Sequence, residues 1–467
     1  MRMTLTDVQH ACAARLSGTD SVCITGIATD NRHVRAGDLF VCIVGEHFDG
    51  HAYAAAAVHS GAVAVLCQRD FESDLGAVPV LRVDNTVRAL GQLAHAWRLR
   101  TAAKVVGVTG SAGKTTVKEV LAQVLSVHGS TACNALNLNN QIGLPTSILR
   151  TQGDEKFWVM EAGISKAHDM DELGGILQPD VALILNVANA HTEGLGDKGV
   201  AWHKSTLLRH LAPHGQSLVS ADYPDLVREA RTADPQVQFF STAAKPLRYR
   251  AAYNGIVRTA TGEERGVYRL WLDGTTVDVE SPFSGAYGTE NVIAIAAIAH
   301  MLGLSNAEIV RGFATASLPQ QRFQTRQIGT WCSINDTYNA NPLSMKRMLE
   351  ASAEKAGKHA LVCLLGAMGE LGAEALPEHY ALGRFLATLR PKAVFWHGAY
   401  FEQLSSGLEA QGYTGICAPV CDPQEFLDQL ARSQVDGGVI LFKGSRSNGL
   451  ERYCQAFEAQ QEKNSAV

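Results

Sequence analysis

The residues with the strongest chemical signature form a glycine-rich segment, 107–116, which reads GVTGSAGKTT. Such a loop lets backbone N–H groups surround phosphate oxygens, and the N-terminus of a following helix adds partial positive charge. Lys114 supplies a full charge for the β- and γ-phosphates of a nucleotide, and the Thr115 hydroxyl can bind Mg²⁺. The strict phosphate-loop pattern has glycine at the position of Val108, so the glycines at 107 and 110 indicate a variant of that loop.

Two further side chains could complete a metal and phosphate site. A phosphate-loop protein needs an acidic group at the end of a neighbouring strand for its metal, and Glu161 directly follows a predicted strand, 157–160. His191 follows a second predicted strand, 181–186, on a loop at the carboxyl end, where open α/β sheets bind ligands. A neutral imidazole there could bind a second metal. On sequence alone, Lys204 is an ordinary helical lysine.

The chain that must position these residues has 467 residues, which is enough for about three domains. In each third, short apolar strands alternate with helices, and this alternation predicts an α/β fold. The middle third is predicted as a doubly wound, mostly parallel sheet with an antiparallel flap at about 249–279. The first and last thirds are predicted as smaller α/β units. The proposed units are 1–100, 101–316 and 317–467, and the last residues, 460–467, are expected to fray.

The predicted elements are as follows. Strands are expected at 38–44, 62–67, 78–83, 104–109, 157–160, 181–186, 217–220, 331–335, 360–365, 393–396 and 438–442. Helices are expected at 53–60, 86–98, 291–304, 343–356 and 380–389, and one follows the phosphate loop.

Charge and composition exclude several classes of protein. There are 41 basic and 46 acidic residues, a net charge of −5, whereas sequence-independent nucleic-acid binding needs a basic face. No apolar run reaches the roughly 18 residues of a membrane span. The ten cysteines are scattered and form no CxxC pair. We therefore expect a cytoplasmic protein with reduced thiols, no nucleic-acid partner and no membrane span.

Short segments spread over nearly the whole chain carry a family resemblance. They are 29–32, 45–51, 109–116, 137–145, 161–163, 186–196, 335–345 and 443–447. In this order they resemble the Mur ligase family, whose members build the peptide stem of bacterial cell-wall precursors. The Tyr-Asn-Ala-Asn stretch at 338–341 resembles the members that add D-alanyl-D-alanine, and the two earliest segments resemble the family's UDP-binding N-terminal domain.

The resemblance implies a three-domain α/β fold, with a Rossmann-like C-terminal domain, and a reaction. ATP phosphorylates the free carboxylate of UDP-MurNAc-tripeptide, and the amine of D-Ala-D-Ala attacks the acyl phosphate to give an amide, ADP and phosphate. No protein nucleophile is needed, which agrees with the lack of an obvious Ser-His-Asp or Cys-His arrangement. The resemblance implies ATP and two Mg²⁺ ions as cofactors, and a monomer is expected.

The resemblance also implies which residues act. ATP-binding residues are Thr109, Gly110, Ser111, Ala112, Gly113, Lys114, Thr115, Thr116, Asn291, Arg322 and Asp336. Substrate-binding residues are Thr29, Asp30, Asn31, Arg32, Phe48, Asp49, Gly50, His51, Asn137, Asn140, Tyr338, Asn339, Asn341, Ser445 and Arg446. Metal ligands are Thr115, Glu161, His191 and Lys204, and catalytic residues are Lys114, His191 and Lys204. In this scheme Lys204 matches the lysine that the family carbamylates, Asp336 accepts from ribose hydroxyls and Arg322 faces phosphate.

Three positions depart from the family pattern, and two other functions stay open. Ala367 stands where the family usually has Asp, Thr206 where Glu often follows the lysine, and Glu290 where His is frequent. A sibling Mur or folylpolyglutamate-type ligase is the nearest alternative. A phosphate-loop switch that drives conformation is another, and ATP turnover independent of an acceptor would favour it. Closure of the units is expected to bend the chain near 317–321.

Overall fold

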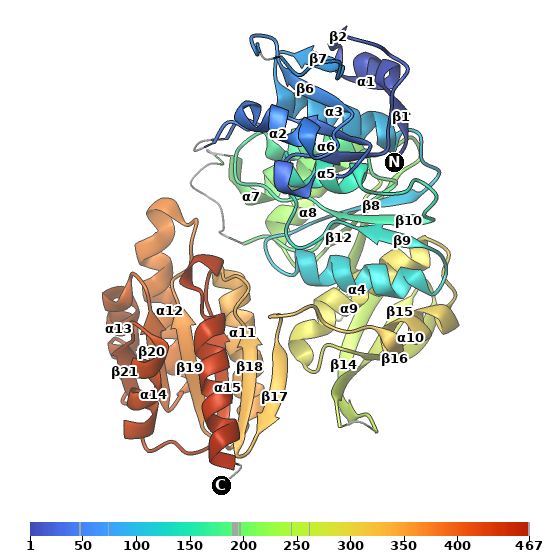
Figure 1. Ribbon diagram of the computed structural model, residues 1–467. Coiled ribbons are helices and arrows are strands. Elements are labelled where there is room, and N and C mark those ends of the chain that lie inside the picture. Colours follow the sequence, from blue (N-terminus) through green and yellow to red (C-terminus); the bar gives the residue numbers. More distant parts are fainter. Residues whose placement is uncertain are drawn as a thin grey trace.

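The computed structural model describes residues 1–45, 48–72, 74–188, 195, 198–243, 245–260 and 262–465 (Figure 1). These residues form sheets of five, nine and six strands, and a two-stranded ribbon. The chain passes from an N-terminal unit through a central unit to a C-terminal unit that lies beside the lower half of the molecule (Figure 1). This α/β architecture confirms the predicted fold class.

The N-terminal unit is a small sheet covered by helices. Its strand order is β2-β7-β6-β5-β4, and all pairs are parallel except the edge pair β2–β7. The elements are β1 (Met3–Thr4), α1 (Leu5–Cys12), β2 (Arg15–Ser17), β3 (Cys23–Ile24), β4 (Gly26–Ala28), β5 (Asp38–Val41), α2 (Ala54–His59), β6 (Ala64–Gln68), β7 (Val80–Val83) and α3 (Thr86–Arg98). The predicted helix 86–98 coincides with α3.

One apolar core joins this unit to the central unit. Leu90 and Trp97 of α3 belong to the same buried cluster as Ile148 and Leu173 of the central unit. The Trp97 indole nitrogen donates to Thr151 Oγ1 at 2.9 Å. Because burial of apolar surface is the main favourable term in folding, the shared core holds the two units together.

The central unit is the nine-stranded sheet, in the order β16-β15-β14-β13-β12-β11-β8-β10-β9. It is parallel from β9 to β14 and antiparallel from β14 to β16, so the predicted flap extends the same sheet. Its strands are β8 (Lys104–Thr109), β9 (Thr131–Cys133), β10 (Phe157–Glu161), β11 (Val181–Ile184), β12 (Gln216–Ser220), β13 (Gln238–Ser241), β14 (Tyr249–Arg258), β15 (Glu264–Leu272) and β16 (Thr275–Ser281).

The helices of the central unit cover both faces of this sheet. They are α4 (Lys114–Ser126), α5 (Gly143–Leu149), α6 (Asp169–Leu177), α7 (Gly199–Ser205), α8 (Pro224–Ala233), α9 (Thr289–Met301) and α10 (Asn306–Thr315). Helix α9 is apolar on all sides, and its residues from Val292 to Ala299 are 0% exposed. A helix of this kind is a buried core element.

The C-terminal unit is a six-stranded sheet, in the order β17-β18-β22-β19-β20-β21, with only the β17 edge antiparallel. Its strands are β17 (Gln324–Ile328), β18 (Trp331–Asp336), β19 (Leu361–Gly366), β20 (Ala393–His397), β21 (Ile416–Pro419) and β22 (Gly438–Lys443). Its helices are α11 (Pro342–Ala356), α12 (Ala375–Leu389), α13 (Phe401–Glu409), α14 (Pro423–Arg432) and α15 (Glu451–Ser465).

The expected fraying of 460–467 is wrong for the residues that the structure describes. Helix α15 continues to Ser465. The guanidinium of Arg326 bridges Glu458 and Glu462 at 3.0 and 2.5 Å, which ties this end of the helix to β17. Among the described residues, no helix is long and apolar enough to cross a membrane.

Candidate functional site

The phosphate loop joins β8 to α4 and is shaped by glycine. Gly113, the residue before α4, has φ +80°, a left-handed conformation that side chains rarely adopt. A Cβ at Gly113 would lie 2.8 Å from Asn291 Oδ1, so the close approach of α9 also requires glycine. In the described part of the chain, this Asn291 oxygen is buried and has no hydrogen-bond partner. It is therefore free to accept from a ligand at the start of α4.

Asn186, which follows β11, fixes the backbone of this loop. Its Oδ1 accepts from the Ala112 amide at 2.8 Å, and its Nδ2 donates to the Ala112 carbonyl at 3.1 Å. The Ser111 amide donates to the Asn186 carbonyl at 3.0 Å. Two consecutive residues of the loop are thus held by one residue that follows the neighbouring strand.

Glu161 lies beside the loop because β10 pairs with β8 in parallel register, with Glu161 opposite Val108. It is 1% exposed. Its two carboxylate oxygens accept from Thr115 Oγ1 at 2.8 Å and from Asn139 Nδ2 at 2.6 Å. The Asn134 amide group bonds the backbone of Glu161 at both N–H and C=O. A carboxylate and a hydroxyl in contact are the oxygen ligands that Mg²⁺ prefers, so this pair fits a magnesium ion.

Two lysines lie close enough to Glu161 for their electrostatics to be coupled to it. Lys114 starts α4 and is half-buried, and burial lowers its pKa while the Glu161 carboxylate opposes that shift. Lys204, on α7, is 1% exposed. Burial and then the charge of Lys114 set its pKa well below the ordinary value, so its amine loses a proton more readily than an exposed lysine.

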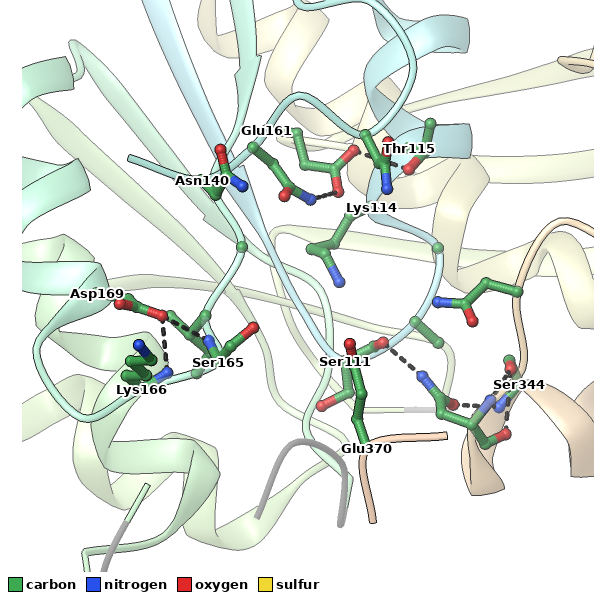
Figure 2. Close-up of a pocket in the computed structure, with 18 of the residues that line it drawn as sticks. Ser111, Lys114, Thr115, Asn140, Glu161, Ser165, Lys166, Asp169, Ser344 and Glu370 are labelled. Atoms are coloured by element: carbon green, nitrogen blue, oxygen red, sulfur yellow. Dashed lines mark hydrogen bonds between the residues drawn. The ribbon is translucent and has the colours of Figure 1, made fainter. Parts of the chain in front are cut away.

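Lys114, Thr115 and Glu161 open onto a cavity of about 800 Å³ between the central and C-terminal units, and Lys204 does not line it. Figure 2 shows the Lys114 side chain reaching into this space, with Glu161 and Thr115 on one side and Ser344 and Glu370 on the other. Predicted residues that line it are Ser111, Ala112, Gly113, Lys114, Thr115, Asn137, Asn140, Glu161, Arg322, Tyr338, Asn339 and Asn341.

The C-terminal unit contributes a cation, an aromatic ring and an amide. The Arg322 guanidinium lies 4.0 Å from the centroid of the Tyr338 ring, a cation–π contact that holds both at the cavity wall. Asn341 Nδ2 donates to the Ser111 carbonyl at 2.8 Å, and Asn341 Oδ1 caps α11 through the Ser344 amide. The phosphate loop is therefore contacted directly by the C-terminal unit.

A smaller cavity of about 70 Å³ adjoins the loop on the other side. Asn291, Arg322, Asp336 and Thr116 line it, together with Gly113. Asp336 is already paired, because Lys443 Nζ lies 2.5 Å from its Oδ2 and the Phe323 amide donates to its Oδ1 at 3.0 Å. A carboxylate oxygen can accept more than one hydrogen bond, so ribose hydroxyls can still be bound.

Other predicted residues lie outside both cavities. Thr109 is buried at the end of β8, and its hydroxyl has no partner among the described residues. Ser445 Oγ accepts from the Gly369 amide at 2.7 Å, and Arg446 donates to Gln321 at 3.1 Å. The Arg446 guanidinium lies 5.9 Å from the Tyr338 ring, at the edge of the larger cavity.

The predicted substrate residues of the N-terminal unit form two local turns. Asp30 pairs with Arg32 at 2.6 Å and caps a short helix (Asn31–His33) that follows Thr29. In the second turn, the Asp49 carboxylate accepts from His51 Nδ1 at 2.6 Å, while His51 Nε2 accepts from the Gln68 amide. Gly50 packs against the backbone at Ile43, and Phe48 is 54% exposed. None of these residues lines either cavity described above.

His191 lies outside the described residues, so its predicted metal role has no geometry here. Among the residues that are described, no group of three or more His, Cys, Asp or Glu side chains could hold a metal. The magnesium fit therefore depends on Thr115 and Glu161, with Lys204 as a third ligand only if it is modified.

Several residues of the site were missed from the sequence. Asn139 and Asn134 hold Glu161, Asn186 holds the loop, and Lys118 donates to the carbonyls of Asn134 and Leu136. The available signal was the four asparagines between 134 and 140, which follow the strand β9. The segment 165–169 also lines the larger cavity, and nothing in its sequence pattern marked it.

Comparison with known proteins decides the family. Residues 23–98, 108–299 and 321–446 match, in turn, the Mur ligase family catalytic domain, the Mur ligase middle domain and the Mur ligase glutamate ligase domain. The UDP-N-acetylmuramoyl-tripeptide--D-alanyl-D-alanine ligase of Escherichia coli (strain K12) is 32% identical, over 98% of both chains. The chain belongs to the Mur ligase family.

Solved structures of this family agree with the fold of this Mur ligase. A crystal structure of MurF from Acinetobacter baumannii has a TM-score of 0.87 at 30% identity and covers 99% of both chains. The MurF ligase of Thermotoga maritima in complex with ADP has a TM-score of 0.81 at 28% identity, covering 94% of this chain and 98% of that one. The similarity extends over all three units.

Proposed function

We propose that this Mur ligase joins D-alanyl-D-alanine to UDP-MurNAc-tripeptide at the expense of ATP, in the synthesis of peptidoglycan precursors. The observation that carries the proposal is the cavity in which Lys114 and Glu161 of the central unit face Arg322 and Tyr338 of the C-terminal unit. The relatives named above, similar over their whole length, support the same activity and the use of ATP.

The reaction brings together ATP, the carboxylate of the tripeptide and D-Ala-D-Ala, all of which carry negative charge. The cavity supplies cations that offset this charge. A carboxylate oxygen of the tripeptide attacks the γ-phosphorus of ATP, the bond to the bridging oxygen breaks, and ADP leaves. The amine nitrogen of D-Ala-D-Ala then attacks the acyl carbon, and loss of a proton and of phosphate leaves the amide. Lys114 and Arg322 offset the charge of the transferring phosphoryl group. The inter-unit position of the cavity limits the access of water to the acyl phosphate.

Magnesium would be held by Thr115 and Glu161, where it supplies charge stabilisation for the phosphate oxygens. Lys204 is proposed to become a carbamate, because its lowered pKa favours the neutral amine that adds to CO₂. In that step the nitrogen of the neutral amine bonds to the carbon of CO₂ and one proton is released, so a neutral amine becomes an anionic ligand. The carbamate and His191 would then hold a second Mg²⁺.

The three units have separate tasks in this proposal. Residues 1–100 bind the UDP group through the turns at 29–32 and 48–51, residues 101–316 bind ATP, and residues 317–467 bind D-Ala-D-Ala and complete the ATP site. Asn137 and Asn140 lie at the cavity wall, where they can bind the peptide stem. The enzyme acts in the cytoplasm as a monomer.

The test is phosphate release by the purified full chain from ATP. Phosphate is measured with UDP-MurNAc-tripeptide, with D-Ala-D-Ala, with both and with neither. We expect release at substantial rate only with both, together with the pentapeptide product. Phosphate release at the same rate with and without D-Ala-D-Ala would favour a conformational switch. Product formed from another amino acid or dipeptide in a substrate panel would favour a sibling ligase.

A further inference from the structure

A buried ion pair joins the C-terminal unit to the central unit close to the phosphate loop. Arg347 of α11 places Nη1 2.7 Å from Oε2 of Glu290, which is in the first turn of α9. Glu290 is 5% exposed. A third group completes the cluster, because Tyr223 donates its hydroxyl to Glu290 Oε1 at 3.0 Å and accepts from Arg347 Nη2 at 2.5 Å.

The same carboxylate oxygen that binds Arg347 also binds the residue that holds the phosphate loop. Asn186 Nδ2 donates to Glu290 Oε2 at 2.7 Å. Through its other contacts, Asn186 bonds both the N–H and the C=O of Ala112. A continuous chain of short hydrogen bonds therefore runs from Arg347 through Glu290 and Asn186 to Ala112, and it crosses the boundary between the units.

A second ion pair on α11 provides an internal comparison. Lys355 lies eight residues after Arg347 on the same helix and pairs with Glu264 of β15. It also crosses between the units. Glu264 is otherwise paired with Arg258 on the adjacent strand β14, and neither residue contacts the phosphate loop. The two pairs thus share a docking role, but only the Arg347 pair leads to Ala112.

The position of Arg347 also relates to the nucleotide cleft. Its side chain lines the small cavity of about 70 Å³ beside Gly113 and Asn291. Sites for drug-sized ligands usually have about 300–1,000 Å³, so this space must widen before a nucleoside can enter. Arg347, docked on Glu290, therefore borders the space that a nucleoside would occupy.

We propose that Arg347 and Glu290 are positioning residues that couple docking of the C-terminal unit to the conformation of the phosphate loop. When α11 is docked, Arg347 neutralises Glu290, and Glu290 orients the amide of Asn186 against Ala112. When α11 moves away, Glu290 loses its cation and Asn186 loses a fixed acceptor, so the loop becomes looser. The assignment of the loop to a nucleotide rests on the proposed function, whereas the coupling itself rests on the contacts above.

The coupling is tested by hydrogen exchange of the full chain without nucleotide, at the Ala112 amide, resolved by overlapping peptides across 107–116. Arg347→Met removes the charge and keeps the unbranched stem of the side chain, and Glu290→Gln removes the charge at the other end. Both variants should accelerate exchange at Ala112 by about fivefold or more, the lower end of ordinary coupling between sites. Lys355→Met should change it less than about twofold, since its pair does not reach the loop.

Three controls separate coupling from general loosening. Exchange in β19, remote from the cluster, should stay at the wild-type rate in every variant. Arg347→Lys keeps the charge and should restore most of the protection. The double variant Glu290→Gln with Arg347→Met should exchange no faster than either single one, because both break the same chain of contacts. If Arg347→Met does not fold, the comparison of Glu290→Gln with Lys355→Met still tests the coupling.

Binding of ADP by titration calorimetry adds a second readout. Arg347→Met should weaken the binding of ADP by about tenfold, and Lys355→Met should weaken it by less than about twofold. Equal exchange at Ala112 in Arg347→Met and Lys355→Met would overturn the coupling. Failure of the wild-type chain to bind ADP would instead refute the assignment of the loop to a nucleotide. Hydrogen exchange at the Ala112 amide, measured without nucleotide, would still test the coupling.

Discussion

Glu161 and Arg32 are both charged residues that the sequence assigns to ligand binding, but their surroundings differ. Glu161 is 1% exposed, and three side chains from two separate segments bind it. The Arg32 side chain is 78% exposed, and its partner Asp30 is two residues away. A buried group held from several sides keeps its geometry before the ligand arrives, whereas an exposed turn can adjust to it. We therefore expect central-unit variants to lower kcat and N-terminal variants to raise KM.

The largest loss is expected from Lys114→Ala. The variant removes the charge that offsets the transferring phosphoryl group, so kcat should fall by at least about 10³-fold. Amide formation with both substrates saturating is the measurement. Lys104→Ala, at the opposite end of β8, is the matched control and should keep wild-type activity. Substantial ligation by the Lys114 variant would refute the assignment of this loop to ATP.

Glu161→Gln should have the second-largest effect on activity. The amide keeps the shape of the side chain but removes a negatively charged ligand. The Mg²⁺ concentration needed for half-maximal activity should therefore rise by about 10- to 100-fold. Activity is measured as a function of Mg²⁺ concentration, with the exposed Glu280→Gln on β16 as control. An unchanged Mg²⁺ dependence would mean that Glu161 only braces the loop through Thr115.

Lys204→Ala tests the proposed carbamate. The variant should lose most activity and regain part of it when short carboxylic acids are added, since a small carboxylate can occupy the space left by the modified lysine. Lys114→Ala should show no such recovery, which controls for a general effect of the acid. Near-normal activity without added acid would make Lys204 a structural residue.

The smallest effect is expected in the N-terminal unit. Arg32→Ala should raise KM for the UDP substrate by about tenfold, the size of one charged hydrogen bond, with kcat nearly unchanged. Arg15→Ala, an exposed arginine on β2, should change neither constant. A fall in kcat with constant KM would contradict the distinction between the two regions.

The same distinction explains what the sequence could predict. Alternation of apolar strands and helices was enough for the fold class and for elements such as α3 and β8, because those patterns are local. Lys114, Thr115 and Glu161 could be predicted because each sits at a strand or helix end. Asn186 and the Arg347–Glu290 pair could not, since their roles depend on contacts between residues 57 to 104 positions apart.

The N-terminal turns show the opposite limit. Asp30 with Arg32 and Asp49 with His51 are contacts between residues two apart, which a sequence motif can encode completely. Their distance from the catalytic cavity is a property of the three-dimensional fold, so the motif alone does not indicate how a ligand bound there reaches Lys114.

The most direct test of the account follows an oxygen atom. UDP-MurNAc-tripeptide carrying ¹⁸O in its terminal carboxylate is incubated with the enzyme, ATP and D-Ala-D-Ala, and the released phosphate is analysed by mass spectrometry. An acyl phosphate requires that one carboxylate oxygen leave with phosphorus, so the account predicts one ¹⁸O in each phosphate formed. Unlabelled phosphate alongside amide product would contradict phosphorylation of the carboxylate.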